Sequence, residues 1–203
     1  MSYPVTYDFY KDYLQNKKFQ EIFNKRKQII RDRYSLKHSD DELIREYFVE
    51  IFSWSVIPYN LLIEINQILD KLGYINRIID PCSGNSFHTF IFSEFCQKSV
   101  STIDIQPEEL SWIETINDNG LDFIKNNCTN NDCLLLSWID YDDLAYNLLY
   151  NFRGDMVISI GNYENISFQY LDLLESNFVL MKRYILNMPW NYIEQIKIYK
   201  RNS

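Results

Sequence analysis

Two acidic residues, each at the end of a short apolar stretch, are the side chains best placed to do chemistry. Asp80 follows Arg-Ile-Ile, and Asp104 follows Val-Ser-Thr-Ile. After Asp80 comes a polar loop with Gly84, which lets the backbone approach a ligand closely, and the helix that follows offers free N–H groups to an anionic group. Asp104 is placed to accept both hydroxyls of a ribose; the alternative is that it only ends a strand or starts a turn.

Strands and helices in alternation must position these two acids. Strand patterns are predicted at 77–80, 100–104, 133–138 and 155–160, and helix patterns at 87–96, 107–113 and 144–149. Such alternation is typical of a parallel, doubly wound sheet, in which ligands bind beyond the carboxyl ends of the strands. Two closing strands, at 178–185 and 195–201, are predicted to form an antiparallel edge pair.

The first third of the chain is predicted to be helical. Residues 39–42 form a capping box, and a later helix runs from Pro58 to its C-terminal cap at Gly73. A basic run between residues 17 and 33 has two interpretations, a solvated helix face or an arm that contacts nucleic acid or an acidic partner, of which the first is the commoner. The predicted domains are a helical extension over residues 1–57 and an α/β domain over 58–203.

The composition limits the class of protein. The 203 residues suit one domain, and a formal charge of -8 argues against a nucleic-acid binder that uses its whole surface, although it leaves room for a local basic patch. Four cysteines without a C-x-x-C pair and two distant histidines give no zinc spacing, so no metal site is predicted. Reduced thiols, the lack of a secretory signal and the lack of a membrane-spanning stretch indicate a soluble protein of the cytoplasm. Abundant Ile, Asn, Tyr and Lys suggest an AT-rich genome, such as that of a protist or a large virus, and for a virus the location is the host cytoplasm.

The chain resembles class I S-adenosylmethionine-dependent methyltransferases in several short motifs. Residues 79–86 (Ile-Asp-Pro-Cys-Ser-Gly-Asn-Ser) and then 103–104 (Ile-Asp) are similar to motifs I and II of that superfamily. Residues 54–58 (Trp-Ser-Val-Ile-Pro), 136–141 (Leu-Ser-Trp-Ile-Asp-Tyr) and 151–155 (Asn-Phe-Arg-Gly-Asp) are similar to a little-described methyltransferase-like group. The resemblance implies a Rossmann-like sheet that is mostly parallel, with an antiparallel edge and helices on both faces, and S-adenosylmethionine as the cofactor.

The resemblance also implies the residues that contact the cofactor. Asp80 and Gly84 would line its methionine end, with Cys82 of the same loop beside them. Asp104 would hold the ribose.

Further residues would serve the adenine and the methyl acceptor. Asp118 would lie near the adenine if residues 112–116 form the third strand. Ser137 would border both cofactor and acceptor. Asp140 or Tyr141 would remove the proton from an amine or hydroxyl acceptor.

Departures from the family pattern separate three functional hypotheses. Cys82 and Ser86 replace two motif glycines, where a Cβ in a left-handed conformation costs on the order of 1–2 kcal/mol, and Ile139-Asp140 replaces a Pro-Pro pair. The first hypothesis is methyl transfer to an undetermined acceptor. The second is a catalytically degenerate relative that binds or regulates a partner, with the aromatic N-terminal helices as contact surface. The third, a nicotinamide-dependent enzyme, lacks the glycines that a pyrophosphate needs.

Overall fold

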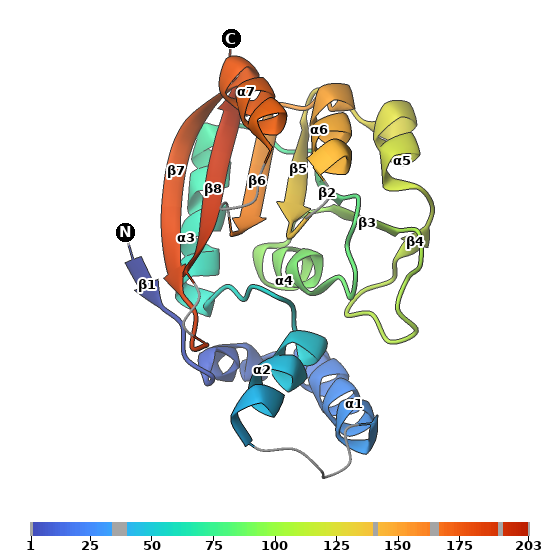
Figure 1. The fold of residues 1–203 in the computed structure, drawn as a ribbon, viewed down its shortest axis with the longest axis vertical. Helices are drawn as coiled ribbons and strands as arrows, with labels where there is room; N and C mark the ends of the chain where they lie inside the picture. The colour runs from blue at the N-terminus through green and yellow to red at the C-terminus, as the bar shows by residue number, and fades with distance from the viewer. Residues whose placement is uncertain (1, 34–39, 140–141, 163–166, 191–192, 203) are drawn as a thin grey trace.

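The computed structural model describes residues 2–33, 40–139, 142–162, 167–190 and 193–202. Within these residues the strands are β1 (Ser2–Pro4), β2 (Arg77–Asp80), β3 (Val100–Asp104), β4 (Ile116–Asn117), β5 (Asp132–Ser137), β6 (Met156–Gly161), β7 (Phe178–Asn187) and β8 (Ile193–Arg201). The helices are η1 (Phe9–Gln15, a 3₁₀ helix), α1 (Lys17–Arg33), α2 (Asp40–Ile51), α3 (Tyr59–Leu72), α4 (Phe87–Cys96), α5 (Gly120–Asn127), α6 (Asp142–Asn151) and α7 (Phe168–Asn177). Figure 1 shows their arrangement around one sheet.

The sheet has the order β1-β7-β8-β6-β5-β2-β3-β4 over the described residues. Strands β2 to β6 pair in parallel, and β8 is antiparallel to both β6 and β7. From β2 the chain moves outward to β3 and β4, and then returns to the other side of β2 to form β5. The order therefore reverses between β2 and β5, which is where doubly wound sheets bind their ligands.

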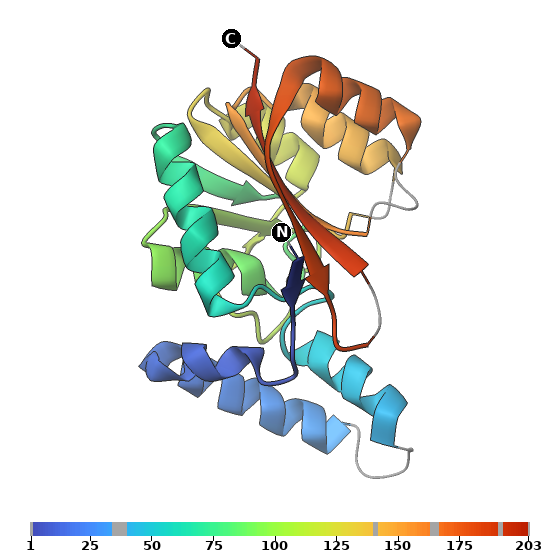
Figure 2. The ribbon, with the colours of Figure 1, turned by 90° about the vertical axis from the view of Figure 1, so that its left-hand side faces the viewer.

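Helices cover both faces of the sheet, and alternate strand residues supply the two cores. In β2, Ile78 packs into the core under α3 and α4, while Ile79 packs into the core under α5, α6 and α7. Both side chains are fully buried, as expected for parallel strands covered on both faces. Figure 2 shows α3 and α4 on one side of the sheet and α6 and α7 on the other.

The N-terminal region packs beyond one end of the sheet through an aromatic cluster. Phe19 of α1 and Phe52, just after α2, each lie within 6.0 Å of the buried ring of Trp112, and the Tyr13 hydroxyl donates to the carbonyl of Ile57 at 2.6 Å. Buried aromatic rings of this kind each remove on the order of 150–250 Å² from water. In Figures 1 and 2, α1 and α2 lie below the sheet, and β1 extends the sheet by pairing in parallel with β7.

Most of the predicted elements are confirmed. Strands β2 and β3 and helices α3 and α4 have the predicted bounds, with Gly73 as the C-terminal cap of α3, and β7 and β8 form the predicted antiparallel pair. The mostly parallel sheet with helices on both faces is likewise the predicted fold class.

Two predictions around residues 107–117 are wrong. No helix forms over residues 107–113, because Trp112 is buried and its backbone N–H donates to the carbonyl of Asn85. The third strand is not 112–116 but the two-residue β4, which still brings Asp118 directly after a strand end. The helices α5 and α7 and the strand β1 were not predicted.

Candidate functional site

A cleft of about 410 Å³ opens at the carboxyl ends of β2, β3 and β5. It brings together five of the predicted cofactor residues: Asp80, Cys82, Gly84, Asp104 and Ser137. Another part of its wall comes from the end of α2 and the segment after it, namely Val49, Glu50, Ser53 and Trp54. The cleft is large enough for a small organic ligand.

Three of the predicted site residues are not part of the described lining of this cleft. Asp118 is absent from the described lining, although its backbone N–H donates to the Asp104 carbonyl at 3.2 Å. The loop of Asp118 lies against the first loop, because a Cβ on Gly120 would fall 2.0 Å from the Pro81 carbonyl oxygen. The predicted catalytic residues Asp140 and Tyr141 lie outside the described residues.

The carboxylate of Asp104 is fixed at the end of β3 by two backbone donors. One oxygen accepts from the N–H of Gly84 at 2.8 Å, and the other accepts from the N–H of Gln106 at 2.9 Å. Each carboxylate oxygen can accept more than one hydrogen bond, so both keep capacity toward the cleft. Asp104 therefore joins the loop after β2 to the end of β3 and presents acceptor atoms to a ligand.

Asp80 is a buried carboxyl in the floor of the cleft. Only 3% of the residue is exposed, and burial raises its pKa from 3.8 to about 7. The Thr89 hydroxyl donates to it at 3.2 Å, and the backbone N–H of Cys82 also favours the charged form, while the charge of Asp104 opposes it. A cationic group in the cleft would therefore ionise Asp80 near neutral pH.

The loop after β2 keeps the cleft open despite its missing glycines. Ser86 has φ 64°, the strained left-handed conformation, but its hydroxyl pairs with Ser83 at 3.0 Å and Thr115 at 2.6 Å, and Ser86 does not line the cleft. Cys82 is not left-handed, so it carries no such strain. Gly84 has φ 51°, and a Cβ there would find no atom within 4 Å.

Cys82 is a poor nucleophile. Burial raises the pKa of its thiol to about 12, and the carboxylates of Asp80 and Asp104 raise it further. A position near a helix N-terminus can lower a thiol pKa, but here burial and the two neighbouring carboxylates raise the pKa instead. Cys82 therefore acts as part of the cleft wall.

A tryptophan pair forms the wall beyond Ser137. The rings of Trp54 and Trp138 lie 5.8 Å apart at an interplanar angle of 37°. Trp138 has φ 51°, and its ring lies against Gly161, where a Cβ would be 3.6 Å from the indole. A left-handed tryptophan is strained, which indicates that surrounding contacts hold it.

The contacts that hold Trp138 lead to a buried glutamate, Glu194. The Trp138 indole N–H donates to the Ser55 hydroxyl, which in turn donates to the carboxyl of Glu194 on β8. Glu194 is 1% exposed, and burial raises its pKa from 4.5 to about 7. This chain of hydrogen bonds fixes the orientation of the indole ring.

His88, at the start of α4, completes the inner wall. Its Nδ1 pairs with the Ser137 hydroxyl at 3.2 Å. Burial lowers the pKa of His88 to about 4, so the ring is neutral at physiological pH. Among the described residues Nε2 has no regular hydrogen bond, although the backbone of Ser55 lies close.

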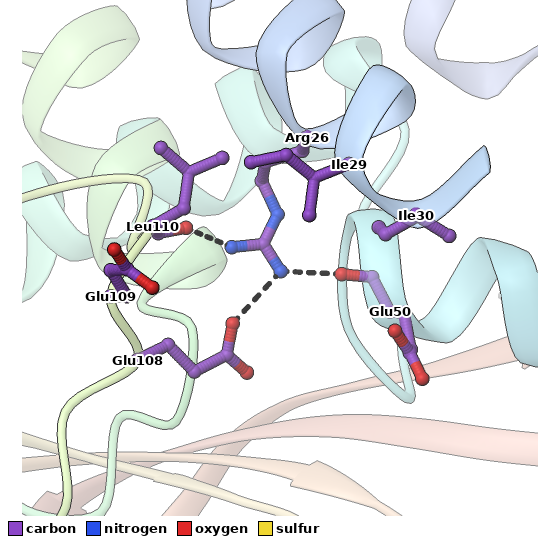
Figure 3. Close-up of a pocket in the computed structure, with 7 residues that line it drawn as sticks. All are labelled: Arg26, Ile29, Ile30, Glu50, Glu108, Glu109 and Leu110. Carbon is purple, nitrogen blue, oxygen red and sulfur yellow. Dashed lines mark hydrogen bonds and ion pairs between the residues drawn. The ribbon is translucent and has the colours of Figure 1, made fainter. Parts of the chain in front are cut away.

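A second hollow of about 550 Å³ adjoins the cleft, since Glu50 and Glu108 line both. Figure 3 shows Arg26 at its centre, reaching the carbonyls of Glu50 and Leu110 and the Glu108 carboxylate, the last at 3.0 Å. Arg26 also donates to the Ile51 carbonyl at 2.9 Å. Through these hydrogen bonds Arg26 links α1 to the end of α2 and to the loop after β3.

The cleft itself is strongly acidic. Its lining holds the carboxyl groups of Glu50, Asp80, Asp104 and Glu108, and no lysine or arginine lines it among the described residues. Within the same part of the chain no group of His, Cys, Asp and Glu could hold a metal ion, and no helix is long and apolar enough to span a membrane. The cleft thus favours a cationic organic ligand over an anionic one.

Several of these residues were not predicted from the sequence. Glu194 lies in register with Ile196 and Ile198 on the inward face of β8, so the period-two pattern could have revealed a buried acid. Arg26 belongs to the basic run between residues 17 and 33, for which the sequence favours a solvated helix face, but Arg26 is 4% exposed. Glu50 reaches the cleft through the packing of α2 beyond the end of the sheet, and Glu108 reaches it from the loop after β3, and no local pattern encodes either placement.

Comparison with known proteins supports the fold. No family model matches the sequence, and no curated protein matches it. A structure of a variant of MtNAS in complex with S-adenosylmethionine has a TM-score of 0.52 at 14% identity, covering 89% of this chain and 72% of that chain. A protein of Escherichia coli described as a methyltransferase has a TM-score of 0.50 at 10% identity, covering 70% and 86%.

A third solved structure, TrmN from Thermus thermophilus, is 12% identical over 68% of this chain. The chain spans 48% of the length of TrmN, and the TM-score of 0.46 is too low to add to the argument. Taken with the sheet order, the two stronger similarities show that this chain has the fold of the class I methyltransferases. At these identities they show the fold alone.

Proposed function

We propose that the protein is an S-adenosylmethionine-dependent methyltransferase. The observation that carries the proposal is the position of Asp104, a carboxylate at the end of β3 that lines the cleft at the point where the strand order reverses. A pair of ribose hydroxyls is the kind of group that such a carboxylate binds. Asp80, Cys82, Gly84 and Ser137 line the same cleft and would contact the rest of the cofactor.

The charge of the cleft favours this cofactor over a dinucleotide. S-adenosylmethionine carries a sulfonium, an ammonium and a carboxylate group, so its net charge is positive. Four carboxyl groups line the described part of the cleft, and one of them, that of Glu108, is paired with Arg26. A pyrophosphate would meet repulsion from these carboxyl groups, and no lysine or arginine is among the described residues that line the cleft. The nicotinamide hypothesis is therefore disfavoured.

The residues of the chain position the reactants and form no covalent bond with them. When bound, the cofactor supplies an electrophilic methyl group. Asp104 orients the ligand, ionised Asp80 attracts the cationic end, and the Trp54–Trp138 wall excludes water from one side. Holding both reactants in line lowers the entropic barrier of a displacement.

The experiment is a calorimetric titration of the full chain with S-adenosylmethionine and S-adenosylhomocysteine. Saturable binding of both is expected, with Asp104→Ala weakening it at least tenfold because the ribose contacts are lost. Asp172→Ala, which removes an exposed acid from α7, is the matched control and should bind like the wild type. No binding at millimolar ligand would leave the second hypothesis, a degenerate relative that binds a partner.

Other expectations from the sequence stay predictions. They are the domain boundary after residue 57, the catalytic roles of Asp140 and Tyr141, contacts of the N-terminal helices with a protein partner, a viral source and a cytoplasmic location.

A further inference from the structure

We propose that the methyl acceptor is a small molecule with a planar nitrogen heteroaromatic ring, which stacks against Trp54 in the cleft and receives the methyl group on a ring nitrogen. This inference rests on the proposed methyltransferase function and adds the class of the acceptor. It depends on the Trp54–Trp138 pair, in which the structure brings together two sequence motifs, residues 54–58 and residues 136–141.

Trp54 is a large aromatic side chain that the protein core does not bury. It lines the cleft and is 48% exposed, although the Trp138 ring and the Arg45 guanidinium lie 5.8 Å and 5.2 Å from its ring. Apolar surface left in water is unfavourable, and the flat face of an indole attracts aromatic rings and planar cations. The position of Arg45 shows that a planar group fits over this ring. The exposed part of the indole is therefore available to a planar ligand.

The backbone of Trp138 provides a second, independent observation. Its φ of 51° is strained for a bulky residue, and such strain occurs preferentially at ligand-binding and active sites. The ring packs against Gly161, and its N–H donates to the Ser55 hydroxyl, which donates to the buried Glu194. An indole that only filled the core would not need a strained backbone. The chain thus fixes the inner ring of the pair and leaves the outer ring, Trp54, exposed to the cleft.

The tryptophan pair lies on the side of the cleft where an acceptor can reach the methyl group. Trp138 directly follows Ser137 at the end of β5, and β5 and β3 flank β2 on opposite sides. Asp104 at the end of β3 would hold the ribose, and Asp80 at the end of β2 would lie at the methionine end. The sulfonium joins these two parts of the cofactor, so its methyl group would lie between them. The tryptophan pair then lies beyond the methyl group, on the side away from the ribose.

A ring nitrogen suits the chemistry of this cleft. A pyridine-type nitrogen has an in-plane lone pair, so it loses no proton when it is methylated. The lone pair forms a bond to the methyl carbon while the carbon–sulfur bond breaks, and the electron pair of that bond stays on sulfur. The products are an N-methylated ring cation and the thioether S-adenosylhomocysteine. The indole faces and the carboxyl groups that line the cleft stabilise such a cation.

The test is a calorimetric titration of the full chain saturated with S-adenosylhomocysteine. The probe is isoquinoline, and its matched comparison is decahydroisoquinoline, which has the same skeleton but is saturated and cationic. Saturable binding is expected for isoquinoline, about tenfold tighter than for decahydroisoquinoline, because only the planar ring can stack on the indole. Tighter binding of decahydroisoquinoline would show that charge alone selects the ligand and would overturn the inference.

Substitutions of Trp54 locate the binding site of the ring. Trp54→Leu should weaken isoquinoline binding about tenfold, the loss of one stacking contact. Trp54→Phe keeps a smaller aromatic face and should bind isoquinoline within about threefold of the wild type. The control is Tyr74→Leu, because Tyr74 is 75% exposed and precedes β2 at the amino end of that strand, away from the cleft. Equal effects of the two leucine variants would overturn the inference.

The same ring chemistry occurs in nucleobases, so a mixed-sequence oligonucleotide is titrated as well. Its phosphates would meet the carboxyl groups of the cleft, and it should bind more weakly than isoquinoline. Preferential binding of the oligonucleotide, or binding of S-adenosylhomocysteine without binding of isoquinoline, would overturn the inference and leave the proposed function intact. If S-adenosylhomocysteine itself does not bind, the proposed function fails first, and the acceptor site fails with it.

Discussion

Asp80 should make the stability of this protein fall as the pH rises toward neutrality. Its pKa is about 7 in the folded chain against an ordinary 3.8, because burial penalises the charged form. Between these two values the folded state binds more protons than the unfolded state, so the free energy of unfolding decreases with rising pH. The full difference corresponds to about 4 kcal/mol, and most of it, about 3 kcal/mol, is lost between pH 4 and pH 7.

The substitution Asp80→Asn isolates this contribution. Asparagine still accepts from the Thr89 hydroxyl, and an imperfect contact with the Cys82 N–H costs about 1 kcal/mol at every pH. Urea unfolding of both proteins from pH 4.5 to 8 gives the difference in free energy of unfolding. That difference should shift in favour of the variant by up to about 3 kcal/mol across the range. A difference that does not depend on pH would refute the buried-carboxyl account of the cleft floor.

Three further predictions concern the surroundings of the cleft. Gly84→Ala should lower stability by about 1 kcal/mol through left-handed strain alone, because its Cβ meets no atom within 4 Å; thermal melting should show a fall of about 2–4 °C. Burial gives Glu194 a pKa of about 7, so wild-type tryptophan emission should change near pH 7 as the support of Trp138 ionises, and Glu194→Gln should abolish that change in a fluorescence titration. Arg26→Met should cost about 3 kcal/mol in urea unfolding, since several carbonyls lose their buried donor, whereas Lys27→Met at an exposed position should cost under about 0.5 kcal/mol.

The sheet could be predicted from the sequence because its signal is local. The first and last residues of apolar runs such as those of β2 and β3 can be identified in the sequence itself. The spacing from Asp80 to Asp104 also fits one strand–helix–strand unit. The helix α5 was missed because its apolar stripe is short, although Asn119 caps it by accepting from the N–H groups of Leu121 and Asp122.

The walls of the site could be predicted only in part. The residues after each strand were found because parallel strands bring their carboxyl ends to one edge. Glu50, Glu108 and Arg26 come from the N-terminal helices and the loop after β3, and they meet only through long-range packing around Trp112. The helix predicted over 107–113 failed for the same reason, because burial of that indole overrides local helix preference.

The most direct test of the proposed function is a crystal structure of the chain with S-adenosylhomocysteine. The account predicts the nucleoside across the ends of β2 and β3, with both ribose hydroxyls within 3.2 Å of the Asp104 carboxylate oxygens, a normal hydrogen-bond distance. A ligand bound elsewhere, or a ribose without contact to Asp104, would contradict it.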